Sequence, residues 1–262
     1  MKQHIMLPRS TLKLFVTDSR LHYLDVESNE IRIGTAKSYN TEENYYPNTT
    51  EKFLADEIET IIGQLRRVLV DFESAKCQIA LSAPLAQLIA KIFVVQSLRV
   101  PDFAEDAFAN SIFAEPLGLS VQYYSALHHN VQNRDYLLSQ VYDDITNGLL
   151  KEYSANILEV PKANRNRSLL LPSSHFIILS NWFILVLNPF WGIVLLPTFE
   201  NNSMKQGENQ QYIAAPHDKD IDLINEGALK HERSFRATPK LIGLRPELER
   251  MQQYLKTEKQ IT

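Results

Sequence analysis

Apolar and polar residues alternate near the N-terminus, and short polar clusters interrupt the alternation. Residues 11–37 read TLKLFVTDSRLHYLDVESNEIRIGTAK, with polar clusters at 18–20 and 27–30. A period of two is typical of half-buried strands, and clusters of Asp, Ser and Asn are typical of turns. The pattern therefore predicts a three-stranded antiparallel meander.

Two longer stretches place their apolar residues three and four positions apart. They cover residues 53–72 and 134–153, and this spacing puts the apolar side chains on one face of a helix. Two shorter helices are predicted at 218–232 and 246–257, the second with a proline just inside its start.

Prolines divide the segment between the two long helices. The apolar residues 78–83 stop at Pro84, and residues 85–100 stop at Pro101. Proline cannot donate to a strand ladder, so each marks the end of a strand. Residues 85–100 also fit a helix, although their β-branched side chains favour a strand. Further short strands are predicted at 121–127 and 157–160.

Residues 169–199 contain no Asp, Glu, Lys or Arg. A run of this length can cross a bilayer as a helix, with a span near 177–196. Basic residues precede the run, as the positive-inside rule expects of a cytoplasmic flank; these are Lys162, Arg165 and Arg167.

The same run contains two turn-like interruptions, Ser180-Asn181 and Asn188-Pro189. They divide it into FIIL, WFILVL and WGIVLL, which are rich in β-branched and aromatic residues. We therefore favour buried strands joined by tight turns, and keep the membrane span as the alternative.

Composition narrows the class of protein. The 262 residues carry a net charge of −4, which argues against a basic nucleic-acid-binding surface. The single cysteine, Cys77, excludes an internal disulfide and suits a reducing compartment, where it reads as a buried thiol. Residues 1–15 lack the apolar region of a secretory signal. We expect a cytoplasmic α/β protein without direct nucleic-acid binding.

Catalytic, cofactor and metal sites are not predicted. The eight glycines are scattered singly, which argues against a phosphate-binding loop. The adjacent His128 and His129 read as a solvated loop pair, and Asp143-Asp144 as a polar helix face. Asp18, at the end of the first predicted strand, is the one carboxylate placed for a metal-dependent nuclease of the ribonuclease-H-like class, which is an alternative function.

A mildly basic stretch lies near the C-terminus and surrounds Phe235. It reads as solvated surface, with contact to acidic lipid headgroups or a partner as the alternative. Its cations are Arg233, Arg236, Lys240 and Arg245.

The order of elements is that of a ribonuclease-H-like or actin-like mixed sheet flanked by helices, followed by a second, β-rich subdomain. The predicted segments are a first subdomain at 1–128, a second α/β subdomain at 129–200, a flexible loop at 201–217 and C-terminal helices at 218–262.

The proline-punctuated segment 79–127 resembles the actin-like type IV pilus assembly family, of the PilM type, including its short relatives in competence and DNA-uptake systems. The matching landmarks are two strands that end at Pro84 and Pro101, an acidic helix from Asp102, a turn at Pro116 and a strand that ends at Tyr123-Tyr124.

The resemblance covers roughly residues 11–200. It implies a non-enzymatic cytoplasmic scaffold, peripheral to the inner membrane, that docks the cytoplasmic tail of an inner-membrane pilus-assembly protein in an apolar groove. Actin-like ATPases bind nucleotide through glycine-bearing loops, whereas TDSRLHYL follows the first predicted strand here. We therefore expect a degenerate member without a cofactor.

Overall fold

The computed structural model describes residues 2–4, 7–39, 41–43, 54–65, 153–179, 182–197, 212–214, 217–235 and 238–261, with Asn48, Lys52, Arg67 and Ile92. Within these residues helices and strands are mixed, so the α/β class is confirmed. Two five-stranded sheets dominate, and a short strand pair joins β1 (Lys2–His4) to β5 (Thr41–Glu43).

The first five-stranded sheet contains three strands of the uncharged run. Its order is β11-β6-β10-β9-β8, with antiparallel neighbours except that β11 lies parallel to β6. The strands are β6 (Tyr153–Glu159), β8 (Phe176–Leu179), β9 (Trp182–Asn188), β10 (Trp191–Pro197) and β11 (Tyr212–Ala214).

The three predicted strands of the run are confirmed as β8, β9 and β10, and the alternative of a helical span at 177–196 is wrong. Both faces of these strands are buried: on β9, Ile184 and Val186 belong to the main core cluster, whereas Phe183 and Leu185 on the opposite face are 1% and 0% exposed. Strands buried on both faces read as continuous apolar runs. No described helix has the length and apolar character needed to cross a membrane.

The turn between β9 and β10 explains why the run breaks at Asn188-Pro189. The Asn188 side-chain oxygen accepts hydrogen bonds from the backbone N–H of Phe190 at 2.8 Å and of Trp191 at 2.9 Å. The backbone oxygen of Pro189 accepts one from Leu169 at 2.7 Å. Asn therefore closes the turn with its own side chain, as such residues commonly do.

The second sheet has the order β2-β3-β12-β7, and β4 pairs with the other edge of β3. All its pairs are antiparallel. The strands are β2 (Val16–Thr17), β3 (Arg20–Asp25), β4 (Glu30–Gly34), β7 (Leu171–Pro172) and β12 (Lys240–Ile242). One sheet therefore joins strands from the N-terminal, central and C-terminal parts of the chain.

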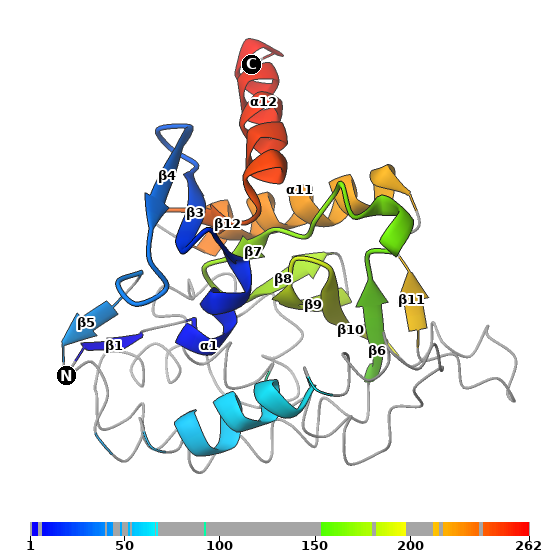
Figure 1. Ribbon diagram of the computed structural model, residues 1–262. Helices are drawn as coiled ribbons and strands as arrows, with labels where there is room; N and C mark the ends of the chain where they lie inside the picture. The colour runs from blue at the N-terminus through cyan, green and yellow to red at the C-terminus, as the bar shows by residue number, and fades with distance from the viewer. Residues whose placement is uncertain are drawn as a thin grey trace, which may run out of the picture.

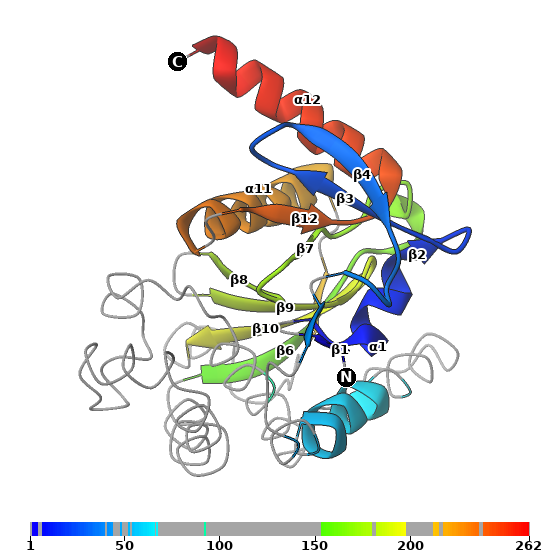
Figure 2. The ribbon, with the colours of Figure 1, turned by 90° about the vertical axis from the view of Figure 1, so that its left-hand side faces the viewer.

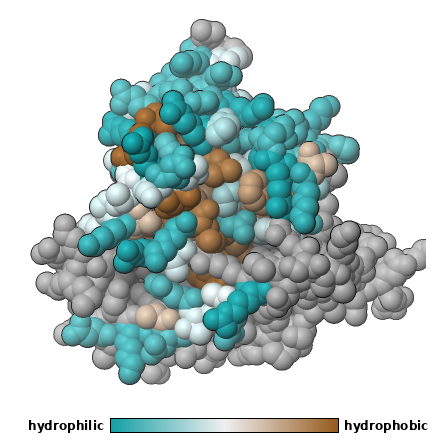
Figure 3. All heavy atoms as spheres, in the orientation of Figure 1, coloured by the Kyte–Doolittle hydropathy of each residue, from teal (hydrophilic) through white to brown (hydrophobic). Residues whose placement is uncertain are grey.

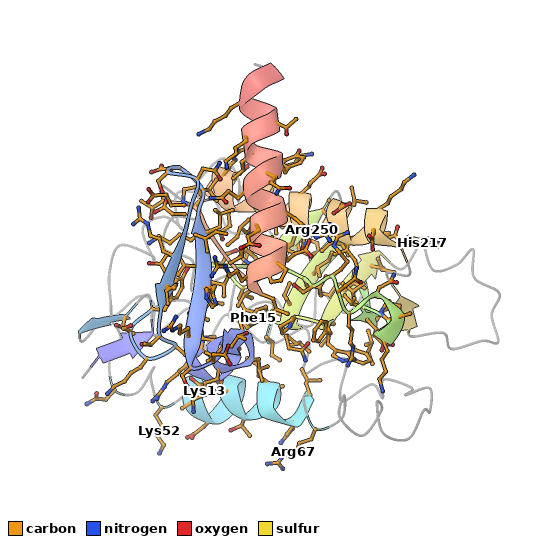
Figure 4. The ribbon with its side chains drawn as sticks, turned by 45° about the horizontal axis from the view of Figure 1, so that its top comes forward. Lys13, Phe15, Lys52, Arg67, His217 and Arg250 are labelled. Atoms are coloured by element: carbon orange, nitrogen blue, oxygen red, sulfur yellow. The ribbon has the colours of Figure 1, made fainter. Side chains whose placement is uncertain are left out.

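The predicted meander is correct for its second and third strands but wrong for most of its first. Residues 11–15 are helical, in α1 (Arg9–Leu12) and η1 (Lys13–Phe15), and only β2 is extended. Leu12 and Phe15 lie three residues apart, so a helical turn buries both, each 0% exposed. Phe15 lies near the centre of the molecule (Figure 4), whereas the Lys13 side chain is exposed.

Two helices complete the C-terminal part, as predicted. They are α11 (Asp218–Phe235) and α12 (Arg245–Ile261). α11 packs closely on β8: a Cβ placed on Gly227 would lie 3.0 Å from Leu179 Cδ1. In Figures 1 and 2, α11 lies between the first sheet and the β3–β4 hairpin, and α12 lies beyond it.

The predicted helix at 53–72 is described only in part. η2 (Leu54–Glu59) is a π-helix and residues 60–65 are α-helical, with Ile61, Ile62 and Leu65 buried as the apolar spacing predicts. Ile92 is helical and 0% exposed, so the helical alternative for residues 85–100 holds at that position.

Some elements differ from the prediction or lie outside the described residues. β6 begins at Tyr153, which the sequence placed in a helix, and β11 and β12 are strands that the sequence pattern missed. β11 lies within the predicted loop at 201–217. β3 pairs antiparallel with β2 and β4, as in a ribonuclease-H-like meander, but it also pairs with the C-terminal strand β12, which that order does not contain, and all described pairs of this sheet are antiparallel. The predicted elements at 78–83, 121–127 and 134–152 lie outside the described residues.

Candidate functional site

A cavity lies where the β2–β3 turn meets the start of α12. Its volume is about 330 Å³, and it is lined by Thr17, Asp18, Arg20, His22, Leu244, Arg245 and Pro246. This volume is near the lower end of the roughly 300–1,000 Å³ of ligand pockets, so it suits a side chain or a small anion.

The β2–β3 turn positions one wall of the cavity. Asp18 and Ser19 have φ of 49° and 63°, so both central residues of this two-residue turn are left-handed. Asp tolerates this conformation better than most residues. The turn places Asp18 and Arg20 at an exposed tip, and alternation along β3 places His22 on the same face as Arg20.

The C-terminal segment positions the opposite wall. β12 pairs with β3, and the Gly243 N–H donates to the His22 carbonyl at 3.4 Å. The chain then turns into α12, whose first turn is closed by hydrogen bonds from Glu247 and Leu248 to the Leu244 carbonyl, at 3.0 and 3.1 Å. Sheet pairing therefore holds Arg245 beside the β2–β3 turn.

Cations outnumber carboxylates in the lining, with Arg20 and Arg245 against Asp18. Arg245 also pairs with Glu249 one helical turn away at 2.9 Å, where both side chains are about half exposed. An exposed pair of this kind is weak, so the Arg245 guanidinium is available to a stronger anion. The lining therefore offers two guanidinium groups that could attract an acidic group, and His22 is also part of it.

Asp18 lies in this cavity with arginines and not among further carboxylates. Within the part of the chain that the structure describes, no group of three or more His, Cys, Asp or Glu side chains could hold a metal ion. The described geometry therefore adds nothing to the alternative of a metal-dependent nuclease.

The described cations of the basic stretch near the C-terminus lie in different surroundings. Arg245 lines the cavity, Arg233 pairs with Glu258 at 2.9 Å, and the Lys240 ammonium lies 6.0 Å from the centre of the Tyr23 ring. Arg236 lies outside the described residues. The stretch is therefore not one basic patch.

Two arginines of the basic flank before the uncharged run make contacts within the fold. The Arg167 side chain is 2% exposed and donates to both carboxylate oxygens of Glu247, at 3.0 and 2.9 Å. It also contacts Asp222, and Asp218 at 3.4 Å. Hydrogen bonding to Glu247 raises the pKa of Arg167, so its charge is permanent. Arg165 lies over the Phe190 ring at 4.9 Å.

A second buried polar group joins α11 to the turn between β7 and β8. Glu232, 0% exposed, accepts hydrogen bonds from the Ser173 hydroxyl at 2.6 Å, the Ser174 N–H at 3.1 Å and the Lys240 N–H at 3.2 Å. The neighbouring His231 packs edge-on against Phe176, and burial lowers the pKa of His231 to about 3. Glu232 and His231 are both buried, so we expect them to affect the stability of the fold.

The described residues of the uncharged run leave little apolar surface exposed for a partner. Apart from half-buried Trp182, the large apolar side chains of β9 and β10 are buried, and exposed large apolar side chains of the described part occur instead at Ile33 and Leu223, which are 53% and 55% exposed. Cys77, His128-His129 and Asp143-Asp144 lie outside the described residues.

Sequence reasoning missed Arg20 and His22 as site residues. They alternate on a strand immediately after a predicted turn, which is a signal for side chains sharing one face near a hairpin tip. Nothing local connects them with Arg245, because that contact depends on the pairing of β12 with β3.

Comparison of the chain with protein families, curated proteins and solved structures finds no match.

Proposed function

We propose that this chain is a non-enzymatic assembly component of a type IV pilus or competence DNA-uptake machine, and that it docks the cytoplasmic tail of an inner-membrane partner. The observation that carries the docking proposal is the cavity between the β2–β3 turn and α12, with two arginines in its lining. Its size and charge favour an acidic side chain of a peptide.

The pilus assignment rests on the proline-punctuated segment at 79–127 and on the resemblance to the PilM-type family. Under this proposal the protein is cytoplasmic and peripheral to the inner membrane. The ribonuclease-H-like, actin-like fold belongs to the same proposal, and it requires residues 77–81 to pair with β2. β2 is the terminal strand of its sheet in the described residues.

Capture from a membrane fraction tests the docking proposal. The immobilised chain is expected to retain a pilus inner-membrane protein from detergent-solubilised membranes, identified by mass spectrometry. Reversing the charge of both cavity arginines, Arg20→Glu with Arg245→Glu, should abolish capture. The matched control is Lys13→Glu, which reverses an exposed cation outside the cavity lining.

Two results contradict the proposal. One is the capture of no pilus protein together with normal piliation and transformation in a deletion strain. The other is capture that survives the double charge reversal, which would place the tail elsewhere on the molecule.

A thermal-shift experiment tests the absence of a nucleotide from the proposed function. A ligand that binds only the folded state raises the midpoint of thermal unfolding. Since the proposed function involves no nucleotide, we expect ATP with Mg²⁺ to leave this midpoint unchanged. A concentration-dependent rise with ATP, absent with Mg²⁺ alone, would return the chain to the nucleotide-binding members of the actin-like class.

A further inference from the structure

β4 forms an edge of its sheet in the described residues. It pairs with β3 on one side, and no described strand pairs with its other side. Figure 1 shows β4 at the periphery of the molecule, and Figure 3 shows a small apolar patch over the β3–β4 hairpin, ringed by hydrophilic side chains. Ile33 on β4 is 53% exposed. An exposed edge of this kind can accept another strand.

The charged side chains of β4 indicate which kind of strand can pair with its outer edge. Its sequence is EIRIG, and alternation places Glu30 and Arg32 on the face opposite Ile31 and Ile33. Arg32 contacts Glu30 at 3.3 Å and Asp25 at 3.5 Å, and both Arg32 and Glu30 are about half exposed or more. These intramolecular pairs are weak, so they leave Arg32 able to meet another carboxylate.

An antiparallel partner with the same sequence satisfies these charges in one register. In an antiparallel pair, opposing residues place their side chains on the same face of the sheet. In a symmetric pair of identical strands, an even-numbered residue must therefore oppose an even-numbered residue, and an odd-numbered residue an odd-numbered one. A two-fold axis at Ile31 sets Glu30 opposite Arg32 of the second copy, twice, and Ile31 opposite its own symmetry mate. A two-fold axis at Arg32 would instead oppose two like charges, which is unfavourable.

We propose that two copies of this chain form a symmetric dimer by antiparallel pairing of their β4 strands, with Glu30 of each copy opposite Arg32 of the other. The occupant of the edge is a second copy because the order of charges along β4 complements itself. The strand is short, so the buried area is below the roughly 1,000 Å² of stable interfaces and the dimer is weak and reversible. The inference is independent of the docking function.

Charge reversal with a swap tests the proposal. Sedimentation equilibrium over a concentration series reaching the millimolar range should show wild-type dimerisation. Glu30→Arg or Arg32→Glu alone should weaken it about tenfold or more, because each change creates two like-charge contacts in the dimer. The double variant Glu30→Arg with Arg32→Glu should dimerise again, within about threefold of wild type.

An equimolar mixture of the two single variants is the sharpest measurement. In the mixed dimer every cation opposes a carboxylate, so the mixture should associate although neither variant does so alone. Circular dichroism and thermal unfolding of each variant verify folding, since both side chains are exposed. A wild-type monomer at all concentrations, association that persists in both single variants, or a mixture that stays monomeric would each overturn the proposal.

Discussion

Arg167 is the residue whose replacement should destabilise this fold most clearly. We consider Arg167→Met, which removes the charge but retains an apolar stem of similar length. In the native structure the Arg167 and Glu247 side chains are 2% and 4% exposed and share two hydrogen bonds, at 2.9 and 3.0 Å. Their contact joins the segment before β7 to the first turn of α12.

The expected cost follows from what the substitution leaves behind. Glu247 keeps hydrogen bonds from the Ser168 N–H at 3.2 Å and from the Asn225 amide at 3.1 Å, but it loses its buried cation. Removing one partner of a buried ion pair costs about 3–5 kcal/mol. In a protein of this size, this cost lowers the midpoint of thermal unfolding by roughly 6–20 °C.

Urea denaturation followed by circular dichroism measures the change in the free energy of unfolding. The control is Arg233→Met, which breaks the Arg233–Glu258 pair at 2.9 Å, where both side chains are more than one third exposed. An exposed pair contributes about 0–1 kcal/mol. Adding Glu247→Leu to Arg167→Met should recover at least about 1 kcal/mol, because the unpaired buried carboxylate is then gone.

Two results would refute this reasoning. One is an Arg167→Met variant that is no less stable than Arg233→Met, which would mean that the buried charge is solvated in another way. The other is an additive further loss of stability when Glu247→Leu is added, which would mean that each side chain stabilises the fold through separate contacts.

Three further predictions concern His231, Gly192 and Glu232. Burial lowers the pKa of His231 from its usual value near 6.5 to about 3, so the unfolded chain binds a proton that the folded chain does not. Stability should therefore fall by about 1.4 kcal/mol per pH unit from pH 6.5 toward 3. His231→Phe should remove this slope and exposed His217→Phe should not; equal slopes in urea titrations of both variants would contradict the burial argument. A Cβ on Gly192 would lie 3.0 Å from the Leu185 carbonyl oxygen, whereas no described residue lies within 4 Å of one on helical Gly63. Gly192→Ala should thus lose about 1–3 kcal/mol and Gly63→Ala gain about 0.5–1 kcal/mol in thermal unfolding, and a reversed order would be inconsistent with close packing at Gly192. Ser173→Ala should cost about 1.5–3 kcal/mol because its hydroxyl donates to the buried Glu232 carboxylate at 2.6 Å, and a loss under 0.5 kcal/mol in urea denaturation would argue that the carboxylate is satisfied without it.

Local chemistry accounts for the elements that the sequence predicted well. The strands β8, β9 and β10 follow from apolar pieces separated by turn residues, and Asn188 closes its turn through its own side chain. The helices α11 and α12 follow from apolar spacing and from an N-terminal proline. In each case the signal lies within a few residues of the structure that it produces, so a reading along the chain can find it.

Elements that depend on distant partners were missed or misread. The short strand β12 has no local signal, and it is extended because β3 and β7 supply its hydrogen bonds on both sides. Residues 11–15 look like a strand, yet a helical turn buries Leu12 and Phe15 against the core. Local propensity yields to packing where the two disagree.

The sequence by itself favoured extended chain for the uncharged run, placed a polar turn at residues 18–20, and predicted helices where α11 and α12 lie. Only the tertiary structure decided that Arg167 neutralises Glu247 inside the protein and that Arg20 and Arg245 share one cavity. The physical reason is range: turn and helix signals act between neighbouring residues, whereas buried charges and cavities are made by segments that meet only when the sheets pair.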